Sequence, residues 1–219
     1  SRPILGKYSP PEFPGHGKDG LGDSGISEST VCDPGIVKPM QAVVALIEMF
    51  KSNPGELELL ALGPLTNIAL AIRMDPMFPT YVKHLTIMGG CENAQGNATM
   101  TAEFNFFADP EAANIVLDAF TGLSSEPSQP AAPKVTLVTW ECCLSHTFSW
   151  EFYDELASCS TPAARLLKQS CAAYEAFDRY GDAAKKEGFL PCDVYAAIAL
   201  EMPHLVAQRL DIFATIETA

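Results

Sequence analysis

An apolar run that leads into a glycine pair and a long polar loop is the feature that most limits how this chain can fold. Leu85 and Ile87 belong to the run, and a Gly-Gly turn follows it. The loop ends at Asp109 and Pro110, residue types suited to the N-cap and the first position of a helix. A strand, a glycine turn and a capped helix in this order indicate a parallel α/β sheet. Such sheets bind ligands beyond the carboxyl ends of their strands.

The rest of the chain alternates between apolar runs and helical spacing, which predicts a mostly parallel central sheet with helices on both faces. We expect one domain over residues 1–219, with a loop-rich start over 1–35 and a linker over 122–133. Strands are expected over 57–62, 83–88, 134–140 and 210–216, and helices over 37–51, 66–74, 110–120, 149–157, 162–184 and 193–200.

Composition limits the possible partners. The net charge of −13 argues against nucleic acid and against an anionic membrane, because both would be repelled. It is compatible with a neutral small molecule and with a locally bound cation. The apolar runs are all shorter than the roughly 20 residues that cross a bilayer. The seven cysteines, an odd number without CxxC spacing, favour a reducing compartment, and we expect a cytoplasmic location.

The polar loop carries candidate binding residues. Asn97, Glu103 and Asn105 offer fixed hydrogen-bonding groups that suit a polyhydroxylated ligand. Glu103 and Asn105 are two residues apart, so in an extended segment both side chains would face the same sugar. Two alternatives stay open: the loop could be an ordinary surface loop, and Glu103 could form a surface salt bridge.

Four motifs in order, LGPLTNIAL (62–70), IMGG (87–90), GNxxxxAEFN (96–105) and ADPEAA (108–113), resemble the inosine-uridine preferring nucleoside hydrolases. The resemblance is specific in this region and weaker before residue 55 and after residue 120. It implies a Rossmann-related α/β fold and hydrolysis of the N-glycosidic bond of ribonucleosides, giving base plus ribose. It also implies that Asn97, Glu103 and Asn105 contact ribose hydroxyls and that Met88 lines the wall beside the sugar.

The resemblance further implies a catalytic calcium ion. Leu190-Pro-Cys-Asp193 is similar to a family segment whose aspartate binds calcium, and the residue before Gly-Pro-Leu-Thr-Asn, here Leu62, would supply a backbone carbonyl. Calcium takes six to eight oxygen ligands, so this donor type is suitable. The alternative for Asp193 is a plain N-cap of the following helix.

The sequence departs from the family pattern in two places. The Asp-rich motif expected near the first strand is absent, so we expect the sequence to be N-terminally incomplete by roughly 70 residues on a single-domain length argument. Cys192 occupies the position where many members have a histidine that protonates the leaving base. His16, in Gly15-His-Gly-Lys-Asp-Gly, resembles a family loop that closes over the site, although a plain glycine-rich loop explains it equally well.

Three hypotheses follow from these residues. The first is a calcium-assisted nucleoside hydrolase. The second is an inactive homologue that binds a nucleoside or a protein partner without catalysis. The third is a different glycosyl-transferring enzyme on the same scaffold. For this chain alone we expect no ribose release, because one carboxylate and one carbonyl make a poor calcium shell. We also expect an exposed apolar sheet edge, and hence association into a possible homo-oligomer.

Overall fold

The computed structural model describes residues 16–25, 40–121, 135–180 and 188–217. The chain divides into two compact units. Unit 1 comprises Ser1–Pro10, Met40–Leu144 and Pro191–Ala219, and unit 2 comprises Pro11–Pro39 and Ser145–Leu190. Unit 1 contains the sheet, whereas unit 2 contains a group of short helices.

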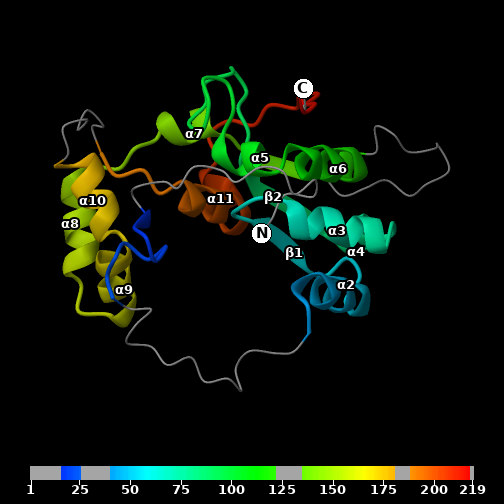
Figure 1. Ribbon diagram of the computed structural model, residues 1–219, viewed down its shortest axis with the longest axis horizontal. Helices are drawn as coiled ribbons and strands as arrows, with labels where there is room; N and C mark the ends of the chain where they lie inside the picture. Colours follow the sequence, from blue (N-terminus) through cyan, green and yellow to red (C-terminus); the bar gives the residue numbers. More distant parts are fainter. Residues whose placement is uncertain (1–15, 26–39, 122–134, 181–187, 218–219) are drawn as a thin grey trace. The chain divides into compact units, whose positions relative to one another are not determined.

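A parallel three-stranded sheet forms the centre of unit 1 (Figure 1). Its strands are β1 (Glu58–Ala61), β2 (His84–Met88) and β3 (Val135–Val138), in the order β1-β2-β3. Ala61 pairs with Ile87, and Ile87 pairs with Leu137, so the three strands end at the same edge. The strands at 57–62, 83–88 and 134–140 are thereby confirmed, each a little shorter than predicted.

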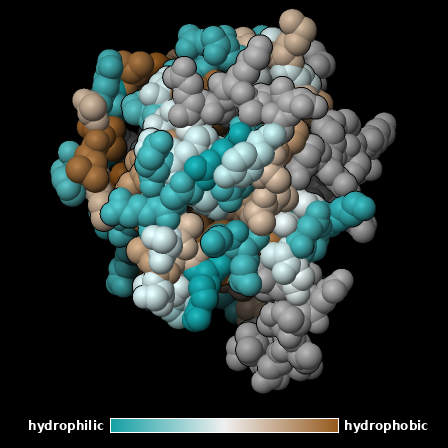
Figure 2. Space-filling model, turned by 90° about the vertical axis from the view of Figure 1, so that its left-hand side faces the viewer, coloured by the Kyte–Doolittle hydropathy of each residue, from teal (hydrophilic) through white to brown (hydrophobic). Residues whose placement is uncertain are grey.

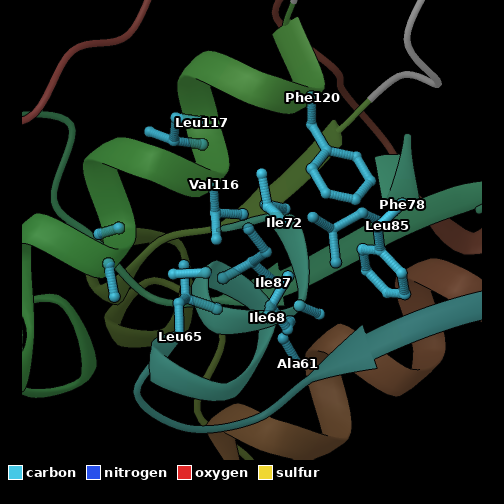
Figure 3. Packing of buried hydrophobic residues seen from close by; sticks show 14 of the residues in the cluster. Ala61, Leu65, Ile68, Ile72, Phe78, Leu85, Ile87, Val116, Leu117 and Phe120 are labelled. Carbon is cyan, nitrogen blue, oxygen red and sulfur yellow. The ribbon is translucent and has the colours of Figure 1, made fainter. Parts of the chain in front are cut away.

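One face of this sheet packs against two helices, α3 (Thr66–Met74) and α6 (Pro110–Thr121). Leu85 and Ile87 point to this face and are fully buried, because alternate residues of a strand share a face. Figure 3 shows their side chains meeting Ile68 of α3 and Val116 of α6. This apolar cluster is the core of unit 1, and its burial is the main force that holds the helices on the sheet.

The helix α11 (Cys192–Glu201) packs against all three strands. Thr86, between Leu85 and Ile87, points away from the α3–α6 cluster, so α11 lies on the opposite face. The predicted α/β class, with helices on both faces of a parallel sheet, is therefore confirmed. The remaining elements of unit 1 are α2 (Ala42–Ser52), α4 (Phe78–Tyr81), α5 (Phe104–Ala108), α7 (Trp140–Leu144) and the short 3-10 helix η2 (Pro203–Leu205).

Asp109 is the N-cap of α6, as predicted, and it also connects α6 to α3. Its carboxylate accepts the backbone N–H of Ala112 at 3.2 Å, which caps α6. It also accepts the hydroxyl of Thr66, the first residue of α3, at 2.5 Å. Asp109 is fully buried, so these bonds replace the water that the carboxylate loses on folding.

Unit 2 contains α8 (Trp150–Ser158), α9 (Pro162–Ser170) and α10 (Ala172–Asp178). Ser149 and Thr161 cap the first two through their side-chain oxygens. An aromatic cluster of Trp150, Tyr153, Tyr174 and Phe189 forms the small core of this unit. The molecular face in Figure 2 is largely hydrophilic, in keeping with the excess of acidic residues.

Four predictions of local structure are wrong. The segment 210–216 forms no strand within the described part of the chain, because apolar alternation alone does not supply a hydrogen-bonding partner. The helix predicted over 162–184 is interrupted at Cys171, between α9 and α10. Trp140 begins α7 instead of ending β3, and residues 104–108 form α5 where an extended segment was expected. Helices of one turn are too short to show a 3.6-residue period. None of the described helices is both long and apolar enough to span a bilayer.

Candidate functional site

The candidate site lies at the carboxyl edge of the sheet. Leu62 follows the last residue of β1, and Met88 is the last residue of β2. Since Ala61 pairs with Ile87 in register, Leu62 and Met88 lie side by side at this edge. Both predicted positions therefore occur where parallel α/β sheets bind ligands.

Asn105 is bound directly to the end of β2. Its side-chain nitrogen donates to the carbonyl of Met88 at 3.1 Å and lies 3.3 Å from the Met88 sulfur. Asn105 is 9% exposed and belongs to α5. The nitrogen of the amide is thus used inside the protein, and the amide oxygen is the polar atom that a ligand hydroxyl could meet.

Glu103 is the N-cap of α5 and is only 2% exposed. One carboxylate oxygen accepts the N–H of Asn105 at 2.8 Å, and the other accepts those of Gly90 at 2.9 Å and Phe106 at 3.1 Å. The predicted alternative of a surface salt bridge is therefore wrong for Glu103. The extended geometry, in which Glu103 and Asn105 were expected to face one sugar, is also wrong, because the chain turns into a helix between them.

Burial dominates the electrostatics of Glu103. It raises the pKa of the Glu103 carboxyl above its usual range, against the opposing effect of the three backbone N–H groups, and the charge of Asp193 raises it slightly further. Glu103 comes from the segment after β2, and Asp193 comes from α11.

The glycine pair allows the chain to turn tightly over Phe106. Gly90 has a φ of +79°, a conformation that side chains rarely adopt, and a Cβ there would lie 2.9 Å from the Phe106 ring. Its N–H donates to Glu103, and its carbonyl accepts the N–H of Trp140 at 3.0 Å. The pair is required because backbone and ring approach too closely for any larger residue.

Glu141 of α7 holds the loop after β2. Its two carboxylate oxygens accept the N–H groups of Glu92, Asn93 and Gln95 at 3.0, 2.9 and 3.1 Å. Burial by itself would raise the pKa of Glu141, but these N–H donors outweigh it and hold the pKa below its usual range. Glu141 therefore fixes the loop as a carboxylate.

Asn97 is exposed on the same loop, but its side-chain oxygen is already used. This oxygen accepts the N–H of Phe104 at 2.7 Å, and the neighbouring Thr99 hydroxyl accepts that of Ala102 at 3.0 Å. Asn97 thus shapes the start of α5. These contacts show that the loop is ordered, and the alternative of an ordinary surface loop stays open because most of its residues are exposed.

Cys192 and Asp193 begin α11. The N-cap of this helix is Pro191, so Asp193 is the second residue of the helix and the N-cap role considered for it is wrong. Its side chain is exposed. Cys192 is half-buried, and interaction with its thiol, together with burial, raises the pKa of Cys143 in α7.

His16 lies in unit 2 and is exposed. Its carbonyl accepts the N–H of Gly22, and the carboxylates of Asp19 and Asp23 bind further backbone N–H groups of residues 18–23. The loop is therefore ordered by its own contacts. Closure of this loop over the site remains a prediction.

Comparison with known proteins agrees with this geometry. A family model described as inosine-uridine preferring nucleoside hydrolase matches residues 1–219. The chain belongs to this family.

Relatives and solved structures support the assignment. The chain is 34% identical over 160 residues to uridine nucleosidase 1 of Arabidopsis thaliana, which covers 73% of this chain and 43% of that protein. It is 39% identical over 101 residues to the pyrimidine-specific ribonucleoside hydrolase RihB of Escherichia coli, which covers 46% of this chain and 31% of that protein. A solved inosine-guanosine nucleoside hydrolase superposes with a TM-score of 0.77 at 27% identity, over 94% of this chain and 61% of that one.

The chain spans less than half the length of the curated relatives it matches, between 29% and 43%. The fold and the family are thus established, and the activity of the complete family enzymes is a separate question for this chain.

The calcium ion that the nucleoside hydrolase family implies does not fit the donors at this site. Asp193 and the carbonyl of Leu62 supply two oxygens, whereas calcium takes six to eight. Within residues 16–25, 40–121, 135–180 and 188–217, no three His, Cys, Asp or Glu side chains converge on one point. We therefore assign no step of the chemistry to a metal.

Sequence reasoning missed two features of the candidate site. Glu141 was given no role from the sequence, yet it holds the loop after β2 through three bonds. An acidic residue just after a strand was the available signal. The contact between α7 and α11 joins segments that are distant in sequence, and no sequence pattern indicated it.

Proposed function

We propose that this chain forms the ribose-binding part of an enzyme that hydrolyses the N-glycosidic bond of ribonucleosides. The observation that supports the proposal is that Asn105 is bonded to Met88 at the carboxyl end of β2, beside the end of β1 that leads to Leu62. The helix α11, which carries Asp193, packs against the same sheet. Uridine nucleosidases and ribonucleoside hydrolases among its relatives support a nucleoside as the substrate. The preferred base is left open by these residues.

The roles of the residues follow from the transition state. Cleavage of an N-ribosidic bond develops positive charge on the sugar ring, as in glycoside hydrolysis. We assign the Asn105 amide oxygen to a ribose hydroxyl, the Met88 side chain to the wall of the site and Asn97 to its rim. The exposed carboxylate of Asp193 supplies negative charge. Glu103 is a positioning residue, because its bonds to Gly90, Asn105 and Phe106 fix where Asn105 lies.

Cys192 has a minor place in this proposal. It is next to Asp193, at the position where the family resemblance puts the proton donor for the leaving base. A thiol is a weak general acid at neutral pH, since its ordinary pKa is near 8.5. We therefore expect leaving-group protonation by Cys192 to contribute little to the rate.

A second candidate function is nucleoside binding without turnover. The donor set favours it, because no group of three or more His, Cys, Asp or Glu side chains in the described residues could hold a calcium ion. The third hypothesis, another glycosyl transfer on this scaffold, gains no support from the nucleoside hydrolases that the chain matches.

Binding and turnover should be measured separately. Isothermal titration with uridine and inosine tests binding, and a reducing-sugar assay with and without calcium tests ribose release. We expect nucleoside binding to the chain, and a loss of affinity of about tenfold for Asn105→Ala, the effect of one hydrogen bond to a buried partner. Gln41→Ala, at an exposed position before α2, is the control and should bind as the parent does.

The outcomes separate the two candidates. Binding without ribose release identifies the nucleoside-binding function, and release that depends on calcium identifies the hydrolase. No binding of either nucleoside, or equal binding by Asn105→Ala, contradicts the proposed site.

The sequence also led to expectations about location and assembly. We propose a cytoplasmic location on the cysteine content; no disulfide joins the six cysteines of the described residues. Association into a homo-oligomer is proposed along the outer edge of β1, which pairs with β2 alone in the described sheet. Light scattering at several protein concentrations tests this association.

A further inference from the structure

The loop after β2 contains two consecutive turns, and the first of them is wrapped around the Glu141 carboxylate. The N–H groups of Glu92, Asn93 and Gln95 converge on this carboxylate at 3.0, 2.9 and 3.1 Å. Ala94 has a φ of +55°, a left-handed conformation that reverses the chain between Asn93 and Gln95. Neighbouring N–H groups that face one point form a nest, an anion-binding site made of backbone. Glu141 therefore fills a backbone site for a carboxylate.

The position of Glu141 is set by the sheet. Glu141 is the second residue of α7, which begins just after β3, and it is only 7% exposed. The N–H of Trp140 donates to the carbonyl of Gly90 at 3.0 Å, and the N–H of Cys143 donates to the carbonyl of Thr139 at 3.1 Å. These bonds fix the start of α7 against the end of β2. The carboxylate is thus a fixed point, and the nest is arranged around it.

The second turn, residues 96–102, connects the nest to α5. Asn97 lies two residues after Gln95, the last donor of the nest. Its N–H donates to the carbonyl of Ala102 at 3.1 Å, and its side-chain oxygen accepts the N–H of Phe104, the first residue of α5, at 2.7 Å. Asn97 is therefore held by the nest on one side and by α5 on the other.

We propose that Glu141 is a positioning residue of the candidate site: its carboxylate holds the nest and thereby fixes Asn97 at the rim. This inference rests on the proposed function, in which Asn97 belongs to the rim of a nucleoside site. Asn105 is held separately, by a bond from its side chain to Met88 and a bond from its N–H to Glu103. Loss of the Glu141 carboxylate should therefore displace Asn97 and leave Asn105 in place.

The first test needs no nucleoside. Glu141→Ala removes a CH2–COO− group, which an acetate ion reproduces, and acetate can reach the nest because Asn93 and Gln95 are exposed. We expect faster hydrogen exchange at the amides of Asn93, Gln95 and Phe104, and an unchanged rate at Asn105. Sodium acetate should restore slow exchange. Sodium chloride at the same ionic strength should not, because chloride lacks the two oxygens that the nest binds.

The second test measures the affinity for uridine by isothermal titration. We expect Glu141→Ala to weaken binding about threefold to tenfold, the effect of losing one hydrogen bond, and acetate to restore it. Addition of Glu141→Ala to Asn97→Ala should cause no further loss, since both remove the same contact. With Asn105→Ala the two losses should add. Glu48→Ala, which removes an exposed acid on α2, is the control for charge and should match the parent in both tests.

Folding of the variant is checked by far-ultraviolet circular dichroism. If Glu141→Ala does not fold, Glu141→Gln takes its place, because it keeps one acceptor oxygen; the same amides should then exchange faster, by a smaller factor. A general stabilising role would instead speed exchange at Asn105 as much as at Phe104.

Three results would overturn the proposal: equal acceleration at Asn105 and Phe104, exchange that acetate does not slow in Glu141→Ala, or additive losses of affinity for Glu141→Ala and Asn97→Ala. Failure of the parent chain to bind uridine contradicts the proposed function instead. The exchange rate of the Phe104 amide then decides by itself whether Glu141 positions Asn97.

Discussion

The carboxylates that surround the loop after β2 differ from the carboxylate at the start of α11. Glu103, the N-cap of α5, and Glu141 of α7 are buried, and each accepts three backbone N–H groups. In α11, the carboxylate of Asp193 is exposed in the first turn. The two acids that hold the backbone thus differ in burial and in partners from the acid that we propose to face a ligand, although in sequence they look alike.

The contrast between these carboxylates predicts the largest loss of stability for Glu103→Ala. The change leaves the buried N–H groups of Gly90, Asn105 and Phe106 without their acceptor. We expect the free energy of unfolding to fall by about 3 kcal/mol, since each buried unsatisfied group costs on the order of 1–3 kcal/mol and some will find water. Urea unfolding followed by circular dichroism measures this. Glu48→Ala, exposed on α2, should change stability by less than about 0.5 kcal/mol.

Glu141→Gln should have an intermediate effect on the free energy of unfolding. The amide keeps one acceptor oxygen, but it loses the charge and turns a donor toward a backbone N–H, which we expect to cost about 1–2 kcal/mol. Hydrogen exchange should show faster opening of the amides of Glu92, Asn93 and Gln95. Unchanged exchange at these three amides would show that Glu141 does not hold the loop.

Glu141 also makes the stability of the fold depend on pH. The folded-state pKa of Glu141 is depressed, so its stabilisation is fully present above the unfolded pKa and is lost as the pH falls through the folded pKa. Glu103, with a raised pKa, acts in the opposite sense: its contribution is fully present below the unfolded pKa and declines as the pH rises through the folded pKa. Unfolding measured between about pH 3 and pH 7 should therefore show a smaller loss of stability on acidification for Glu141→Gln than for the parent.

Asp193→Asn should have the smallest effect on stability, below about 0.5 kcal/mol, because the side chain is exposed. Its effect should instead appear in the pKa of Glu103 and in nucleoside binding. Removing this charge should lower the pKa of Glu103, which Asp193 helps to raise, and should weaken nucleoside binding. Carboxyl carbon NMR titration follows the pKa. Asp211→Asn, an exposed position in the C-terminal segment, is the matched control. A fall in stability equal to that of Glu103→Ala would remove the contrast between the two regions.

The fold was largely predictable because its signals are local and repeated. The helix over Thr66–Met74 and the cap at Asp109 follow from residue type and spacing, and the three strands follow from short apolar runs. The missing strand at 210–216 shows the limit of such patterns. A strand needs a partner, and alternation of apolar residues contains no information about one.

The site was predictable by position and less so by role. Met88 and Asn105 lie together at the carboxyl end of β2 because their motifs follow that strand. That Asp193 of α11 faces the same ligand stays a prediction. Glu103 was expected to face a sugar, but its side chain turns inward to cap α5. Which hydrogen bonds a carboxylate makes depends on where a one-turn helix begins, and that is decided by tertiary contacts such as the packing of Phe106 against the glycine pair.

A crystal structure of the chain with bound uridine tests the central claim most directly. The account predicts the ribose at the carboxyl edge of β1 and β2, with a hydroxyl in hydrogen-bond contact with the Asn105 amide oxygen and Asp193 facing the same sugar. A uridine bound elsewhere on the chain, or a ribose that meets Asn105 while Asp193 points to a different cavity, would contradict it.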